Sequence, residues 1–269
     1  MTLRNVISGV TLKEDADNGV YICYIEDFSD ELKEEIRKML SSIWHGSVAS
    51  AESNQFNYKN TLRRLLERYN TKDDNTKKGM IGELLIHLLM PRYTNLRAVS
   101  VMKNKEENSI KKGFDVVYCD ERSSIWYCEV KSGGDTNTTE EINTKNKELI
   151  NNAKSGIEAL SLGNRATLWD SVLIDVNLTI FNSDKQIEIK NLLNKHHPDS
   201  ENRNMDRNVV LSSVLYKSME NKICPSILAD HKNSIAAEKI FVGLLIFSIQ
   251  KPTYKKIADF LTEESNDHE

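Results

Sequence analysis

The chain has 269 residues, with 36 Lys and Arg residues against 40 Asp and Glu residues and a net charge of −4 at pH 7. This length allows one large domain or two small ones. The mildly acidic balance argues against tight autonomous binding to DNA, which normally requires a basic surface. No apolar run is long enough to predict a membrane span, and the N-terminus lacks the layout of a signal peptide. We therefore expect a cytoplasmic protein without a membrane partner.

The early part of the chain predicts one strand and two helices. The apolar residues 20–25 are typical of a buried strand, and an apolar stripe at helical spacing predicts a helix that begins at Ser29 or Asp30. Residues 45–60 are polar and predict a loop, which a short helix near residues 60–70 follows.

A locally basic segment lies between residues 59 and 78. It contains seven basic and three acidic residues, which gives a local charge of +4. A basic patch on one element is typical of proteins that bind nucleic acid, but charged residues also cover ordinary solvated helix faces. The segment is therefore consistent with a DNA-contacting patch or with an exposed helix surface.

Residues 77–90 predict a helix that is covered on most sides. One wide face is apolar, and further apolar residues surround Glu83 on the other side. A glutamate in such surroundings is rarely unpaired, and the neighbouring Gly82 permits close approach of another backbone. Glu83 is therefore either a carboxylate directed at a functional site or part of the polar stripe of an amphipathic helix.

Two runs of aromatic and β-branched residues, 113–118 and 125–131, flank a polar turn and predict a β-hairpin. If the hairpin is symmetric about Arg122, Asp115 lies opposite Glu129. The same register pairs Val117 with Tyr127 and Cys119 with Ile125. The two carboxylates would then share one face of the sheet, roughly 5 Å apart at their β-carbons.

The paired carboxylates suggest a chemical role. They repel each other, so a fold that keeps them requires a shared proton, a cation or a bound metal. Lys131 points to the same face as Glu129 but adds only one positive charge. Mg²⁺ typically binds one or two carboxylates together with water and phosphate oxygens, and Lys131 could hold an attacking water or stabilise charge on a phosphate. The alternative is an exposed hairpin with a weak surface ion pair.

The remaining residues mix helices and strands. We expect a turn at residues 132–135, a long helix near 138–161, strands at 172–180, 209–215 and 241–248, a final helix that ends near Leu261, and a disordered tail at 262–269. This mixture favours an α/β or α+β fold with a mixed central sheet flanked by helices. Residues 1–75 would form an N-terminal extension packed on a core domain of residues 76–261.

Glu83 on a helix, Asp115 on a strand and Glu129-x-Lys131 on the next strand resemble the PD-(D/E)xK nuclease superfamily. The resemblance covers about residues 77–160 and departs at Phe114, which replaces the proline that names the superfamily. It implies a nuclease-like core of that type. Members commonly carry a polar residue on the helix after the Glu-x-Lys strand. The candidates here are Lys145, Lys147, Asn151 and Lys154.

This resemblance also implies an activity and a role for each residue. The protein would be a metal-dependent deoxyribonuclease with Mg²⁺ or Mn²⁺ as cofactor. Asp115, Glu129 and the Val130 carbonyl would bind the metal, with Glu83 as a third carboxylate, directly or through water. Lys131 would orient the water that attacks a phosphodiester.

More narrowly, the chain resembles the HamA nuclease subunits of Hachiman-type bacterial anti-phage defence systems. Residues 79–83, 113–115 and 128–132 carry this resemblance, together with the late apolar strand at 241–247. It implies DNA as the substrate and a helicase (ATPase) as the partner in a heteromeric complex. That partner would restrain the nuclease until aberrant DNA is sensed.

Two other functions are consistent with the sequence. The chain could be a non-catalytic DNA-binding or regulatory scaffold subunit with a nuclease-like core, which the acidic net charge favours. A scaffold, however, has no need for clustered carboxylates beside a lysine. The chain could also be a stand-alone restriction-type endonuclease, and a neighbouring helicase gene would argue against that function.

Overall fold

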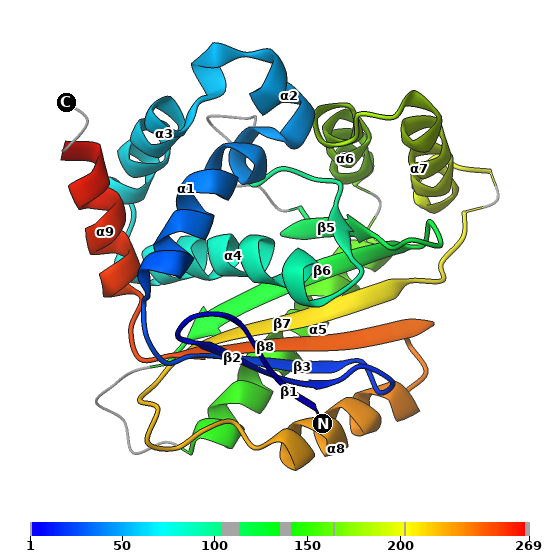
Figure 1. Ribbon diagram of the computed structural model, residues 1–269. Coiled ribbons are helices and arrows are strands. Elements are labelled where there is room, and N and C mark those ends of the chain that lie inside the picture. The colour runs from blue at the N-terminus through cyan, green and yellow to red at the C-terminus, as the bar shows by residue number, and fades with distance from the viewer. Residues whose placement is uncertain (1, 104–112, 135–140, 164, 202, 267–269) are drawn as a thin grey trace.

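The computed structural model describes residues 2–103, 113–134, 141–163, 165–201 and 203–266, whose strands form one eight-stranded sheet in the order β1-β2-β3-β8-β7-β6-β5-β4 (Figure 1). The strands are β1 (Thr2–Ile7), β2 (Val10–Asp15), β3 (Val20–Ile25), β4 (Arg97–Ala98), β5 (Val116–Cys119), β6 (Ile125–Gly133), β7 (Asn208–Tyr216) and β8 (Gly243–Lys251). The helices are α1 (Asp30–His45), α2 (Ser47–Glu52), η1 (Asn54–Phe56), α3 (Tyr58–Asn70), α4 (Asp74–Tyr93), α5 (Ile142–Leu162), α6 (Ala166–Thr179), α7 (Ser183–His196), α8 (Pro225–Ala237) and α9 (Lys255–Asn266).

The sheet has a parallel centre and antiparallel edges. β3, β8, β7 and β6 pair in parallel, whereas β1 and β2 continue one edge and β5 and β4 the other by antiparallel pairing. Helices cover both faces, which confirms the predicted α/β class with a mixed sheet flanked by helices. The strands within residues 1–75 belong to this same sheet, and the boundary at residue 75 stays a prediction.

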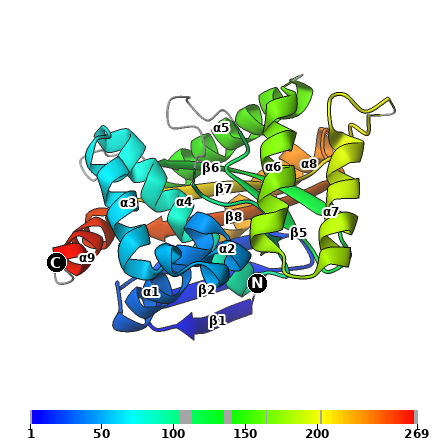
Figure 2. The ribbon, with the colours of Figure 1, turned by 90° about the horizontal axis from the view of Figure 1, so that it is seen from above.

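Two apolar clusters fill the space between the sheet and its helices. The first lies under α1, α3, α4 and α9 and includes Cys128 and Val214 from the sheet. The second includes Tyr127 and Leu211 and lies under α5 and α8, with α6 and α7 side by side next to β5 (Figure 2). Because successive strand residues point to opposite faces, Glu129 faces the α5 side together with Tyr127. Among the helices of the described residues, none has the length and apolarity that crossing a membrane requires.

The predicted hairpin is confirmed with two of its three predicted pairs, whereas Asp115 precedes β5 and is not paired with Glu129 in the ladder. β5 and β6 pair with Val117 opposite Tyr127 and Cys119 opposite Ile125. The Asp120 side chain stabilises the turn, since it accepts hydrogen bonds from two backbone N–H groups within it. The strands predicted at residues 20–25, 209–215 and 241–248 correspond to β3, β7 and β8, and Ser29 is the N-cap of α1 as predicted.

The strand predicted at residues 172–180 is wrong, because this segment belongs to α6 and the residues that follow it. Trp169, Val172 and Val176 recur at helical spacing and are buried, whereas Ile174 is 53% exposed. A strand would have placed residues 172, 174 and 176 on one face. The long apolar run therefore reflects a helix that is apolar on more than its buried side.

The loop predicted at residues 45–60 is also wrong in part. It contains α2 and η1, and neither of these short helices buries a side chain. A helix without a buried face has no amphipathic pattern in its sequence. The polar composition of this segment therefore concealed its helices.

Three predicted boundaries shift. The predicted disordered tail is wrong for residues 262–266, which continue α9, while residues 267–269 lie outside the described part of the chain. β6 extends to Gly133, so the turn predicted from residue 132 begins later. Residue 135 of that turn and residue 138, the predicted start of the long helix, lie outside the described residues, and α5 is described from Ile142.

Gly46 joins α1 to α2 at a point that favours glycine. Its φ of 96° lies in the left-handed region, and a β-carbon there would overlap the Leu178 carbonyl of α6. We expect Gly46→Ala to lower the free energy of unfolding by about 2 kcal/mol or more, because backbone strain and displacement of α6 add together. Urea denaturation followed by circular dichroism measures this change.

Gly79→Ala is the matched control for this prediction. A β-carbon at Gly79, inside α4, would meet no described neighbouring atom within 4 Å. Its replacement should stabilise the protein by about 1 kcal/mol, the usual effect of removing a glycine from a helix interior. Equal stability of Gly46→Ala and the wild type would show that the junction tolerates a side chain.

Candidate functional site

The site predicted from the sequence lies where β5 begins. Val116 and Cys128 are the last residues that pair in the hairpin. β6 continues beyond them to Gly133. Over this stretch β7 is its only strand neighbour among the described residues, so the other edge of β6 is open. The side chain of Asp115, just before β5, takes up the first position at this open edge. Its Oδ2 accepts a hydrogen bond of 2.7 Å from the N–H of Val130. The Asp115 carboxylate is thereby fixed beside β6.

Val130 directs its carbonyl toward the same edge. In an antiparallel ladder, the N–H and the C=O of a residue point to the same side of its strand. Since the Val130 N–H reaches Asp115, the Val130 carbonyl also faces the Asp115 side of β6. Its side chain packs against the cluster under α4. The backbone oxygen and the carboxylate that were predicted to share a site are therefore neighbours.

Glu129 and Lys131 lie on the α5 face of β6 and form an ion pair. Lys131 Nζ donates a hydrogen bond of 2.6 Å to Glu129 Oε1. Glu129 is only 6% exposed, and its second oxygen, Oε2, has no hydrogen-bond partner among the described residues. A buried acceptor without a donor is costly, so this oxygen is available to a cation.

The charges of this pair are set by burial and by Asp115. Burial is the main cause that raises the pKa of Glu129 to about 7; Asp115 acts in the same direction and Lys131 opposes both. Burial lowers the pKa of Lys131, but the Glu129 carboxylate outweighs it, so the pKa of Lys131 is raised above its ordinary value. Lys131 is therefore protonated at neutral pH. A protonated lysine can orient water or stabilise negative charge, but it cannot accept a proton.

Glu83 approaches from the opposite face of the sheet. Its helix, α4, comes close to β6 at Gly82, where a β-carbon would overlap the Ser132 hydroxyl. Glu83 follows this contact, and its Oε1 lies 4.0 Å from Nε2 of His87, one helical turn later. The glycine predicted to permit close approach therefore does so, and it brings Glu83 toward the part of β6 that carries the site.

All three carboxylates affect the pKa of one buried thiol, that of Cys128. Burial raises the pKa of Cys128, and the charges of Asp115, Glu129 and Glu83 raise it further. Cys128 lies on the α4 face of β6, between Glu83 on its own side and the hairpin carboxylates. The three acids are therefore within electrostatic range of a single residue, although they come from both faces and from the edge of the sheet.

The four polar candidates on α5 occupy different positions. Lys154 forms ion pairs with two glutamates, Lys147 lies close enough to α8 to influence a histidine there, and Asn151 is exposed. Lys145 is next to the end of β6, with its Cε 3.8 Å from the position of a β-carbon at Gly133. Lys145 is thus placed beside the end of β6, where it also forms an ion pair with Glu148.

The prediction from sequence missed Gly156 of α5. A β-carbon at Gly156 would lie 2.7 Å from Glu129 Oε1, so the backbone of α5 forms one wall around this carboxylate. The available signal was an isolated glycine within a helical pattern, which often marks close packing. Nothing in the sequence indicates which strand residue packs there.

The donor set fits a hard divalent cation. Two carboxylates and a backbone carbonyl are oxygen ligands of the type that Mg²⁺ and Mn²⁺ bind, and Mg²⁺ usually retains several waters. The Oε2 of Glu129 is buried and has no hydrogen-bond partner among the described residues, which makes it a candidate ligand atom for such an ion. Within the described residues, no group of three or more His, Cys, Asp or Glu side chains could hold a metal by itself. A metal here would therefore combine the two carboxylates with the carbonyl, water or substrate.

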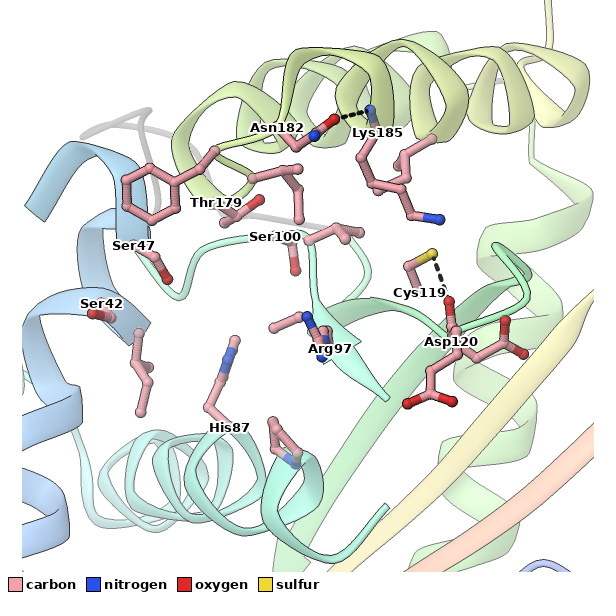
Figure 3. Close-up of a pocket in the computed structure, with 18 of the residues that line it drawn as sticks. Ser42, Ser47, His87, Arg97, Ser100, Cys119, Asp120, Thr179, Asn182 and Lys185 are labelled. Carbon is pink, nitrogen blue, oxygen red and sulfur yellow. Dashed lines mark hydrogen bonds between the residues drawn. The ribbon is translucent and has the colours of Figure 1, made fainter. Parts of the chain in front are cut away.

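A separate cavity lies at the other end of β5 (Figure 3). It has a volume of about 670 Å³ and is bounded by α1, α4, β4, the hairpin turn and the α6–α7 connection, with Arg97 and His87 among its lining residues. Asp115, Glu129 and Lys131 do not belong to its described lining. Its size suits a small ligand, but it is distinct from the carboxylate site at the β6 edge.

Comparison with known proteins extends the resemblance to nearly the whole chain. The model of the HamA family matches residues 2–264, well beyond the residues that carry the likeness to PD-(D/E)xK nucleases. A comparison with curated proteins finds no match. The matched span includes every residue of the site at the β6 edge.

Proposed function

Because the chain belongs to the HamA family of Hachiman-type defence subunits, we propose that it is the metal-dependent deoxyribonuclease of a bacterial anti-phage defence complex. It would hydrolyse phosphodiester bonds with a core of the PD-(D/E)xK type. A helicase subunit of the same complex would control its access to DNA.

One arrangement supports this proposal: Asp115 lies at the open edge of β6, within electrostatic range of the buried Glu129 carboxylate and its protonated partner Lys131. Asp115 is tied to Val130, and Glu129 is tied to Lys131 with one buried oxygen left open. Such an arrangement costs stability in the absence of a ligand, because the buried Oε2 of Glu129 lacks a hydrogen-bond donor among the described residues. A binding function explains why a fold would retain it.

Each residue then has a distinct task. Asp115, Glu129 and the Val130 carbonyl would hold the metal, which supplies an activated water and neutralises charge on the scissile phosphate. Lys131 would orient the attacking water and stabilise the negative charge that grows on phosphate oxygens. Glu83 would complete the site from the α4 side, directly or through water. Lys145, beside the end of β6, would contact a phosphate of the DNA backbone.

The charge of the chain supports control by a partner. The net charge of −4 does not favour strong autonomous binding to a polyanion. Within the basic segment at residues 59–78, the cations Lys77 and Arg64 lie over aromatic rings and two others pair with acids. A helicase that delivers DNA to the site would compensate for this weak basic surface.

Cleavage of labelled linear and circular DNA in Mg²⁺ tests the proposal. The protein should be assayed alone and with any helicase encoded beside it. Cleavage only in the presence of the partner and nucleotide would support a gated effector, whereas equal cleavage without the partner would favour a stand-alone restriction-type endonuclease. Absence of cleavage and of metal binding in a folded protein would contradict the assignment.

Metal binding can be tested without DNA. We expect Asp115→Asn to weaken Mn²⁺ binding by about 10- to 100-fold in calorimetric titration, because a neutral amide replaces an anionic ligand. The fold should survive, since the amide oxygen can still accept the hydrogen bond from Val130. Asp17→Asn, in an exposed turn, is the control and should bind Mn²⁺ like the wild type. Unchanged binding by Asp115→Asn would remove this residue from the site.

A scaffold function is the second candidate. The observation in its favour is that no set of three or more ligating side chains is preassembled in the described residues, while Lys131 already neutralises Glu129. A scaffold would show no Mn²⁺ binding that depends on Asp115 or Glu129. It would still support phage defence when Lys131 is replaced.

A further inference from the structure

Helix α5 approaches β6 so closely that a glycine faces the Glu129 carboxylate. A β-carbon at Gly156 would lie 2.7 Å from Oε1, 3.1 Å from Cδ and 3.2 Å from Cγ of Glu129. The 2.7 Å distance is shorter than real β-carbon contacts, and the other two are unusually tight. Glu129 therefore rests directly on the backbone of α5, and the missing side chain of Gly156 is what makes room for it.

This glycine is unfavourable for the helix that contains it. A glycine inside a helix destabilises it relative to alanine, and an isolated glycine there usually has a packing or functional reason. Gly79 of α4 is a useful contrast, because a β-carbon there would meet no described neighbouring atom within 4 Å. A helical glycine in this protein therefore does not always mark a close approach, whereas Gly156 does so at Glu129.

A buried network of polar side chains fixes the position of α5 along the strands of the sheet. Ser213 Oγ donates a hydrogen bond of 2.7 Å to Asn146 Oδ1 and lies 2.8 Å from Ser248 Oγ, which also accepts a hydrogen bond of 3.3 Å from Asn146 Nδ2. All three residues are buried. Ser213 is the register partner of Lys131 on the neighbouring strand. The network therefore anchors α5 at the level of the site.

From these contacts we propose that Gly156 is a positioning residue for Glu129. Its bare backbone holds the carboxylate so that Oε1 meets Lys131 and Oε2 remains open for the cation. Any side chain at this position rotates the carboxylate out of the cation site and separates it from Lys131. The assignment of the cation rests on the proposed function, whereas the position of the carboxylate does not.

The first test compares Gly156→Ala with the wild type by calorimetric titration with Mn²⁺ and by thermal unfolding in EDTA. We expect Mn²⁺ affinity to fall by about 10- to 100-fold, the usual effect of losing support for a metal ligand. Secondary structure should be retained, because alanine is the better helix former. Gly79→Ala is the matched control and should retain wild-type affinity. Wild-type affinity in Gly156→Ala would overturn the proposal.

The variant Glu129→Asp distinguishes a positioning role of Gly156 from a general loss of stability. Glu129→Asp retracts the carboxylate by one methylene, so it no longer occupies the space that an alanine at Gly156 would fill. Gly156→Ala should therefore cause little further loss of Mn²⁺ affinity when Glu129→Asp is already present. Equal losses in both backgrounds would show that the two residues act independently and would contradict the proposal.

A crystal structure of metal-free Gly156→Ala gives a readout that does not depend on metal binding. We expect the contact between Glu129 Oε1 and Lys131 Nζ, 2.6 Å in the wild type, to be broken. If wild-type protein fails to bind Mn²⁺, the proposed function fails, yet this crystal structure still decides the role of Gly156. An unmoved Glu129 carboxylate in the variant would overturn that role.

Discussion

Lys131→Ala is expected to reduce DNA cleavage by about 100- to 1000-fold and to abolish protection against phage. The protonated ammonium group, held next to the carboxylates by its 2.6 Å contact with Glu129, is the cation best placed to orient water and to stabilise charge on the phosphate. Mn²⁺ binding should persist, because the oxygen ligands remain. Cleavage is measured with labelled DNA in the presence of the partner helicase, and protection by phage plaque assays.

The stability of this variant must be measured alongside its activity. Removal of Lys131 leaves Glu129 buried without its cation, and an uncompensated buried charge is strongly destabilising. Thermal unfolding at several pH values shows whether the protein remains folded under the assay conditions. Lys33→Ala is a suitable control, since Lys33 is also a partly exposed, ion-paired lysine. Activity retained in all of Asp115→Ala, Glu129→Ala and Lys131→Ala would refute the nuclease assignment.

Glu129→Gln is expected to abolish metal-dependent cleavage and also to change how stability depends on pH. The pKa of Glu129 is raised by burial from 4.5 to about 7 in the folded protein. A raised carboxyl pKa contributes stability that is complete below pH 4.5 and is lost as the pH rises through 7. The loss amounts to about 3 kcal/mol at pH 8. Glutamine cannot ionise, so the variant lacks this loss.

The measurement is urea denaturation of metal-free protein at pH 5 and pH 8. The free energy of unfolding of the wild type, relative to Glu129→Gln, should fall by about 2.5 kcal/mol between the two pH values, because part of the loss has already occurred at pH 5. The ion pair with Lys131 forms as Glu129 ionises and is therefore already included in the pKa of Glu129, and the other titrating groups are common to both proteins. Glu148→Gln, an exposed position on α5, should follow the wild type. Parallel curves for Glu129→Gln and wild type would show that Glu129 does not titrate in this range.

The hairpin and its carboxylates could be predicted because the determinants are local. Two short β-branched and aromatic runs around a polar turn specify both the strands and their register, and the observed pairing of Val117 with Tyr127 follows. The alternation of side chains then determines that Glu129 and Lys131 share a face. No contact from a distant part of the chain is required for these inferences.

Other elements could not be read in this way. The apolar run of α6 lacks the polar stripe that distinguishes a helix from a buried strand, and only burial of Trp169 and Val176 against exposure of Ile174 shows its period. The helices α2 and η1 bury no side chain, so their sequences lack the apolar pattern that would indicate a helix. In each case the sequence pattern was ambiguous, and tertiary contacts decided the conformation.

The sequence could propose the members of the candidate site, whose role stays a prediction, but it could not indicate the residues that support them. Residue types and spacing identified Asp115, Glu129 and Lys131, whereas the contact of Gly156 with Glu129 depends on how α5 packs on the sheet. Likewise, the sequence could not show that Glu83 reaches the site strand from the opposite face. Such relations between distant segments arise only from the assembled fold.

The order of strands has a consequence for synthesis of the protein. Among the described strands, β8 is the last to leave the ribosome, yet it lies between β3 and β7 near the middle of the sheet. A nascent chain that lacks β8 keeps two separate groups of strands, each with an unpaired edge that invites aggregation. A truncated product would thus be insoluble rather than a smaller working protein. The centre of the sheet can therefore close only when residue 251 has emerged, after all the other described strands have been made.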